Sequence, residues 1–154
     1  MLDVPAFIEK SRNLYGFNHF INDAGGSVCE LDNEEVLQTL SNHTLIIYIQ
    51  ASKDNESILK QRAIDSPKPL YYREAFLDQQ LSDYMQEKSI EFVALIEPDD
   101  FVRWVFPKLF NARIPRYESI AERYAYTIQT SELYKVKSES DFLTLIETAI
   151  DRTP

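Results

Sequence analysis

A continuous run of apolar residues, TLIIYI at residues 44–49, constrains the fold of this chain more than any other feature. A strand with one solvated face alternates apolar and polar residues, whereas a strand buried on both faces of a parallel sheet is apolar throughout. The run therefore predicts a strand inside a parallel sheet. Because parallel strands are joined by long crossovers, usually helices, the rest of the chain should supply helices and further strands.

Helical patterns flank this run on both sides. Pro5 suits the first turn of a helix over residues 4–15, and Gly16 suits its end. The segment DNEEVLQTLSN (32–42) combines an Asp/Asn cap, acids in the first turn and apolar residues at helical spacing. Ser138 opens a capping box that begins a C-terminal helix. Further helices are expected at about residues 54–64, 73–88, 99–111 and 115–125.

Two shorter apolar segments complete the predicted sheet. HFIN (19–22) is expected to form a strand with AGGS (24–27) as its exit loop, and YTIQT (126–130) is expected to form another. Strands that alternate with helices predict an α/β domain with a parallel sheet of about three short strands. The length of 154 residues fits a single domain, residues 1–154.

Composition narrows the classes of partner and the compartment. A net charge of −9 argues against nucleic acid or an anionic membrane as the main partner. No apolar run approaches the length of about 20 residues that a membrane span needs. The single cysteine, Cys29, allows no disulfide within the chain and suits a reducing compartment. We therefore expect a cytoplasmic protein.

The segment NDAGGS (22–27) is the densest group of candidate functional residues. Ligands bind at the carboxyl ends of strands in an open parallel sheet, where Gly25 and Gly26 offer amides to an anion, with Ser27 beside them. Asp23 is placed to hold Mg²⁺ directly or through water. The same residues also suit a plain turn in which the Asp23 carboxylate caps the loop. Both interpretations stay open from the sequence.

Thiol and zinc chemistry find little support in the sequence. A nucleophilic Cys29 needs a base, and the only two histidines, His19 and His43, are expected away from it. The residues show no zinc-ligand spacing. A buried, inert cysteine is the favoured interpretation.

Cations gather in two stretches of this acidic chain. Residues 60–73 include Arg62, Lys68 and Arg73, and residues 113–123 begin with Arg113. A basic loop beside prolines can close over phosphates, and it can equally be a solvated helix end where the helix dipole favours cations. For the aromatic residues nearby, packing in a core is favoured over a groove for a ligand or partner; they are Tyr71, Tyr72, Trp104, Phe106 and Phe110.

The order of these segments resembles the shikimate kinase-like branch of the P-loop kinases, in the nucleoside monophosphate kinase fold. The matching segments are AGGSV after a strand, IIYIQAS, the lid segment R…KPL, RIPRYESIA, and a short strand before the last helix. The resemblance covers nearly the whole chain and implies a three-layer parallel sheet. It divides the chain into a core (1–66 and 112–154) and a helical lid or insertion (about 67–111).

The resemblance also implies roles for residues near a phosphoryl acceptor. Gly25 and Gly26 match the glycines that contact the acceptor, and Ser27 falls where the family often has a third small residue. Arg113 matches the arginine that reaches the acceptor. Asp23 stands where related P-loop enzymes place an acid near Mg²⁺, which implies an indirect metal contact.

The lid residues follow from the same resemblance. Lys68 matches the lid arginine that covers the transferred phosphate, and it keeps the charge but loses the bidentate fork. Arg73 falls within this lid, and Arg62, which lies shortly before it, is assigned to the lid as well. Together with Asp23 and Arg113, Lys68 is expected to act on the phosphoryl group.

One part of the family pattern has no match in this sequence. The phosphate loop G-x-x-x-x-G-K-[ST] and its strand are absent. In the family that strand lies between the strands matched by residues 19–22 and 44–49, and its loss leaves unpaired backbone groups in the sheet centre. We expect the chain to be the C-terminal part of a longer protein, or to receive the strand from a partner chain. A rearranged sheet or a homodimer is the other alternative.

The leading hypothesis is the acceptor-binding and lid portion of an ATP-dependent, P-loop kinase-like ATPase or phosphotransferase with a small-molecule acceptor. ATP and Mg²⁺ are the cofactors expected for the complete enzyme, with no tight binding to this chain alone. The second hypothesis is a non-enzymatic, acidic helical module whose aromatic stretch, at about residues 71–110, docks a protein partner.

Overall fold

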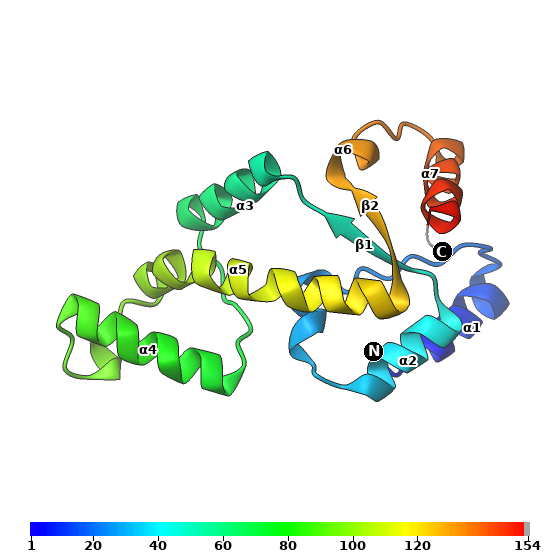
Figure 1. The fold of residues 1–154 in the computed structure, drawn as a ribbon. Coiled ribbons are helices and arrows are strands. Elements are labelled where there is room, and N and C mark those ends of the chain that lie inside the picture. Colours follow the sequence, from blue (N-terminus) through cyan, green and yellow to red (C-terminus); the bar gives the residue numbers. More distant parts are fainter. Residues whose placement is uncertain (153–154) are drawn as a thin grey trace. The chain divides into compact units, whose positions relative to one another are not determined.

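The computed structural model describes residues 1–152 as a mostly helical α/β protein with a small parallel sheet (Figure 1). Its strands are β1 (Ile46–Gln50) and β2 (Ala125–Gln129). The helices are α1 (Val4–Tyr15), α2 (Glu34–His43), α3 (Lys53–Asp65), α4 (Glu74–Lys88), α5 (Pro98–Tyr124), α6 (Thr130–Leu133) and α7 (Glu139–Asp151), with the 3₁₀ helices η1 (Gly25–Glu30) and η2 (Val93–Leu95).

The chain forms two compact units. Unit 1 consists of Met1–Gln50 and Tyr117–Pro154, and unit 2 consists of Ala51–Arg116. The sheet therefore belongs to unit 1, and unit 2 is helical. Within residues 1–152, no helix combines the length and the apolar character that crossing a bilayer requires.

The sheet confirms two of the predicted strands. β1 and β2 pair in parallel, from Ile46 opposite Ala125 to Gln50 opposite Gln129. The Thr130 hydroxyl donates to the Gln50 carbonyl at 2.8 Å, which ties the two strand ends together. Ile49 and Ile128 are register partners, yet Ile128 is 1% exposed and Ile49 is 50% exposed. This difference fits the packing of α6 and α7 against β2.

The third predicted strand, at residues 19–22, is wrong. These residues have no regular secondary structure, and the predicted exit loop lies largely in η1. The sheet in residues 1–152 has two strands instead of about three. A short apolar segment becomes a strand only where a neighbouring strand pairs its backbone groups, and no strand pairs with this one among the described residues.

Most predicted helices are confirmed with close bounds. Gly16 has a φ of 66° and ends α1 in the left-handed region that glycine adopts readily. Side chains cap α2, α3 and α7 at their first turns, where Asn33, Ser52 and Ser138 each accept a backbone N–H. Ser138 also forms the predicted capping box with Asp141. The short helix α6 was not predicted.

The two helices predicted at residues 99–111 and 115–125 form the single helix α5. Pro107 and Pro115 lie inside it, although proline removes a backbone donor and normally ends or bends a helix. Val105 and Leu109, on the same helix, are almost completely buried. We attribute the continuity of α5 to this burial. Local signals in the sequence do not show which residues will be buried.

The two units have separate cores. In unit 1, Val4, Val36 and Leu40 are buried together, with Ile8 and Ile46 packed against them. In unit 2, Tyr84, Phe101 and Val105 are buried, and the partly buried aromatic residues packed against them are Tyr72, Phe76 and Trp104. The interpretation as core residues is therefore confirmed for Tyr72 and Trp104, and it is wrong for Tyr71, which is 58% exposed.

Candidate functional site

The glycine segment of unit 1 forms a turn closed by its own aspartate. Oδ1 of Asp23 accepts the backbone N–H of Gly25 at 2.9 Å. Gly25 has a φ of 66°, and an added Cβ would meet no atom within 4 Å, so the backbone conformation rather than space favours glycine there. Gly26 and a half-buried Ser27 follow in η1. The amide of Gly25 is thus donated within the turn, as in the plain-turn interpretation.

Asp23 is the residue for which the sequence predicts a metal contact. It is a single exposed carboxylate, and one of its oxygens accepts the Gly25 amide. Within residues 1–152, no group of three or more His, Cys, Asp or Glu side chains is arranged to hold a metal ion.

All four predicted cations lie in unit 2. Lys68 is exposed in the segment between α3 and α4, Arg62 is exposed in the last turn of α3, and Arg73 directly precedes α4. Nη2 of Arg113, on α5, donates to the Tyr71 carbonyl at 2.7 Å. This bond joins the predicted acceptor arginine to the segment that carries the predicted lid residues. The glycines and Asp23 belong to unit 1.

Tyr72 adds a hydroxyl to this group of residues, and sequence reasoning missed it as a functional candidate. Its hydroxyl oxygen is buried and has no hydrogen-bond partner among the described residues. Burial raises the pKa of the Tyr72 hydroxyl above its usual value, and the positive charge of Arg113 acts in the opposite direction. Tyr72 therefore keeps its proton at neutral pH and can donate it in a hydrogen bond. The signal in the sequence was its place in a basic, proline-flanked segment.

Cys29 and the histidines take positions that fit structural roles. Cys29 is buried and is not part of a disulfide. Nδ1 of His19 lies 3.6 Å from Oε1 of Glu139, and both side chains are mostly exposed. His43 lies in the last turn of α2, where the helix dipole favours a positive charge.

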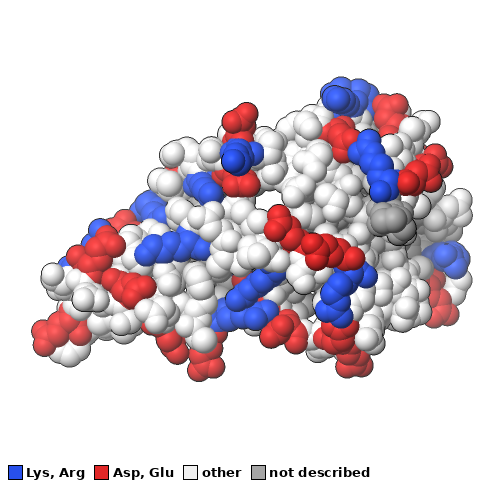
Figure 2. Space-filling view, viewed as in Figure 1, with Lys and Arg blue, Asp and Glu red and all other residues white. Residues whose placement is uncertain are grey.

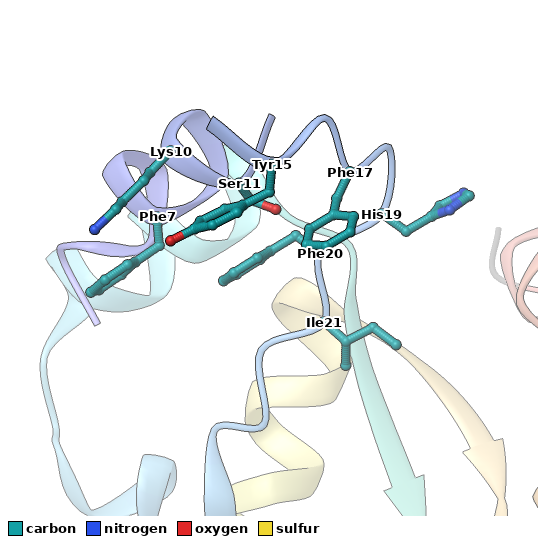
Figure 3. A pocket seen from close by; sticks show the side chains of 8 residues that line it. All are labelled: Phe7, Lys10, Ser11, Tyr15, Phe17, His19, Phe20 and Ile21. Carbon is teal, nitrogen blue, oxygen red and sulfur yellow. The ribbon is translucent and has the colours of Figure 1, made fainter. Parts of the chain in front are cut away.

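A hollow in unit 1 is lined by Phe7 and Tyr15 of α1 and by Phe17 and Phe20, which follow α1 in the chain (Figure 3). Its volume is about 430 Å³. The rings of Tyr15 and Phe17 are stacked with centroids 5.9 Å apart, and Phe7 and Phe20 lie around the same space. Four aromatic residues between positions 7 and 20 are the signal that could have indicated it.

The charged residues do not form a field of one sign on the face shown in Figure 2, where acidic and basic side chains are interspersed. Comparisons of the chain with protein-family models, with curated proteins and with solved structures gave no match.

Proposed function

We propose that this chain is the acceptor-binding and lid portion of a P-loop kinase-like phosphotransferase, with Arg113, Tyr72 and Lys68 acting on the phosphoryl group. The observation that carries the proposal is the bond from Arg113 to the Tyr71 carbonyl. It joins two segments that the family resemblance assigns to one phosphoryl group, and they lie 42 positions apart in the chain.

The chemistry of these side chains suits a phosphoryl oxygen. A guanidinium presents several N–H donors in a planar fork that matches phosphate, and the bond to the Tyr71 carbonyl sets its orientation. The buried hydroxyl of Tyr72 is a donor that a ligand oxygen would satisfy, which removes the cost of leaving it unpaired. Lys68 is exposed and supplies a movable positive charge, as a lid residue requires.

The small number of strands in the sheet is a second argument for the proposal. Parallel sheets are normally buried on both faces and contain more strands than the two in unit 1. In the family, a strand that carries the phosphate loop lies beside the strand matched by β1. We propose that such a strand, from another segment or chain, extends this sheet and supplies the missing loop.

ATP and Mg²⁺ would be held mainly by that completing segment. The chain contains no G-x-x-x-x-G-K-[ST], so it lacks the lysine and the hydroxyl that hold the phosphates and the metal in P-loop enzymes. Asp23 is the residue of this chain that would contact Mg²⁺, through water. We expect the 154-residue chain alone to hydrolyse no ATP. If the chain alone hydrolysed ATP and Arg113→Ala abolished that activity, the proposal that another segment supplies the phosphate-binding loop would be contradicted.

The proposal is tested by titrating the chain with phenyl phosphate at constant ionic strength and following backbone amide shifts. We expect saturable changes centred on Tyr72 and Arg113. Arg113→Lys should raise the dissociation constant about tenfold, because the charge remains but the fork is lost. Arg103→Lys is the matched control, since Arg103 also donates to a backbone carbonyl in unit 2, that of Ile64. Equal effects of the two variants, or no saturable change, would refute a phosphoryl site here.

The second candidate function is a non-enzymatic interaction module. It is favoured by the exposure of Tyr71, Phe92 and Leu95 within the aromatic stretch expected to dock a partner. The same titration separates the candidates, because an interaction module of this kind needs no phosphomonoester site.

A further inference from the structure

An apolar loop in unit 2 stands out among the exposed residues. It joins α4 to α5 and includes η2, and its Phe92 and Leu95 side chains are 60% and 67% exposed. Glu91 and Glu97 flank these apolar residues and are exposed as well. Residues 87–100 contain five acids and one lysine, so the loop combines apolar side chains with a strongly negative surrounding.

The hollow of unit 1 has complementary properties. Its lining is aromatic, and Lys10 lies at its edge, whereas the imidazole of His19 points away from it (Figure 3). Between residues 4 and 21 the chain has two cations, Lys10 and Arg12, and one acid. Asp3 and Asp23 lie just outside this stretch and Glu139 lies 3.6 Å from His19, so the basic character of the edge comes from Lys10. Exposed aromatic surface with a basic edge suits an apolar segment flanked by acids.

We propose that a second copy of this chain inserts its 91–97 loop into the hollow of the first, with Phe92 and Leu95 among the aromatic rings. Glu91 and Glu97 then face Lys10. Charge favours a second copy as the occupant, because an apolar surface alone accepts many partners. The negative charge of the loop is opposite to the positive charge of Lys10 at the edge of the hollow. The two surfaces are also present at equal concentration in every solution of the chain.

The contact is of the groove-to-loop type, so each copy carries both halves of it. Two copies that exchange both contacts form a closed dimer, and copies that make one contact each form a longer assembly. In both cases the mean mass rises with concentration. None of the contacting residues belongs to the proposed phosphoryl site, so the self-association is independent of phosphomonoester binding.

The apolar half of the proposal is tested by sedimentation velocity over a wide concentration range. Phe92→Ser and Phe7→Ser should each raise the dissociation constant of self-association about tenfold or more, since apolar anchors carry most of the affinity of an interface. Ile58→Ser is the matched control, because Ile58 is exposed to a similar degree on α3 and lies outside both surfaces. A chain that is monomeric at every concentration overturns the proposal, as does an equal loss in the control.

The charged half is tested with reversed charges. Lys10→Glu and the double variant Glu91→Lys, Glu97→Lys should each weaken self-association, because each places like charges at both contacts. Mixing the two variants makes both contacts complementary again and should restore association between unlike copies. Lys135→Glu and Glu118→Lys, at exposed positions elsewhere, are the matched control pair. Restoration by the test pair alone supports the loop-in-hollow contact, and failure to restore association refutes it.

Discussion

Unit 1 and unit 2 are built on different kinds of contact. In unit 1 the strands β1 and β2 bring together residues 79 positions apart, such as Gln50 and Gln129. In unit 2 the aromatic core comes from neighbouring parts of the chain, and Tyr84, Phe101 and Trp104 make edge and stacked ring contacts at 5.1–6.2 Å. The comparison shows that unit 2 depends on ring packing, whereas unit 1 depends on one distant strand pair and leaves half of its aromatic residues exposed.

The largest expected effect compares the two sets of aromatic residues. Phe101→Ala should destabilise the chain by about 3–5 kcal/mol, because it leaves a cavity among Tyr84, Trp104 and Val105. Phe7→Ala, at an exposed ring of unit 1, should change the stability by no more than about 0.5 kcal/mol. Urea denaturation of both variants measures the difference. Similar losses for the two would show that the contrast between the units is wrong.

The second effect concerns the strand pair. Ile128→Ala should cost about 2–4 kcal/mol, because Ile128 is fully buried against the helices that pack on β2. Its register partner Ile49 is half exposed, so Ile49→Ala should cost only about 1 kcal/mol. Hydrogen exchange of the β1 and β2 amides should reveal the weakening within unit 1. An Ile49 variant as damaging as the Ile128 variant would indicate that another element covers β1.

The helix caps provide a smaller comparison of the two units. Ser138→Ala in unit 1 should cost about 1 kcal/mol, since it removes the hydroxyl that accepts the Asp141 N–H of the capping box. Ser52→Ala in unit 2 removes a single cap bond of 3.3 Å and should cost about 0.5 kcal/mol. Thermal unfolding measures both. Ser119→Ala, at an exposed interior position of α5, is the control, and a loss there equal to the Ser138 variant contradicts the capping argument.

The smallest expected effect is on the acid dependence of stability. The backbone N–H of Lys137 and the Ser138 hydroxyl hold the pKa of Asp141 below its usual value. A carboxylate with a lowered pKa in the folded state stabilises the fold above the unfolded pKa, and this contribution disappears as the pH falls through the folded value. Stability should therefore decline below about pH 4.

Variants assign this decline to the two units. In unit 2 a bond from Lys88, with a second from Trp104, lowers the pKa of Glu87 in the same direction. Asp141→Asn and Glu87→Gln should each flatten the profile of unfolding free energy between pH 3 and 7. Asp78→Asn, at an exposed position of α4, should leave its shape unchanged. A profile that no variant flattens would mean that neither carboxylate contributes.

Local signals in the sequence predicted the helices well. Gly16 ends α1, Ser138 begins α7 with its capping box, and the apolar run at residues 44–49 overlaps β1. These features act through neighbouring backbone groups, so they can be recognised without knowing the fold. The strand predicted at residues 19–22 failed for the opposite reason, because an apolar segment needs a pairing strand that its own residues do not specify.

The contacts of the candidate site are likewise of two kinds, local contacts that the sequence indicates and distant contacts that it does not. The sequence identified Asp23 and Gly25 as neighbours in a loop, and the bond between them is local. The link between Arg113 and the Tyr71 carbonyl spans distant positions, and the sequence could indicate it only through a resemblance in motif order. The buried hydroxyl of Tyr72 depends on packing around it, which no motif expresses.

By itself, the sequence determined where α1 ends and where α2 and α7 begin, that most of the 44–49 run becomes a strand, and that the chain is acidic with one cysteine. These properties arise from local backbone bonding, side-chain type and charge. Only the tertiary structure decided that β1 pairs with β2, that α5 continues through Pro107 and Pro115, and that Phe92 and the ring of Phe7 stay exposed. Those outcomes depend on which distant surfaces exclude water from one another, and burial is a property of the whole fold rather than of any segment.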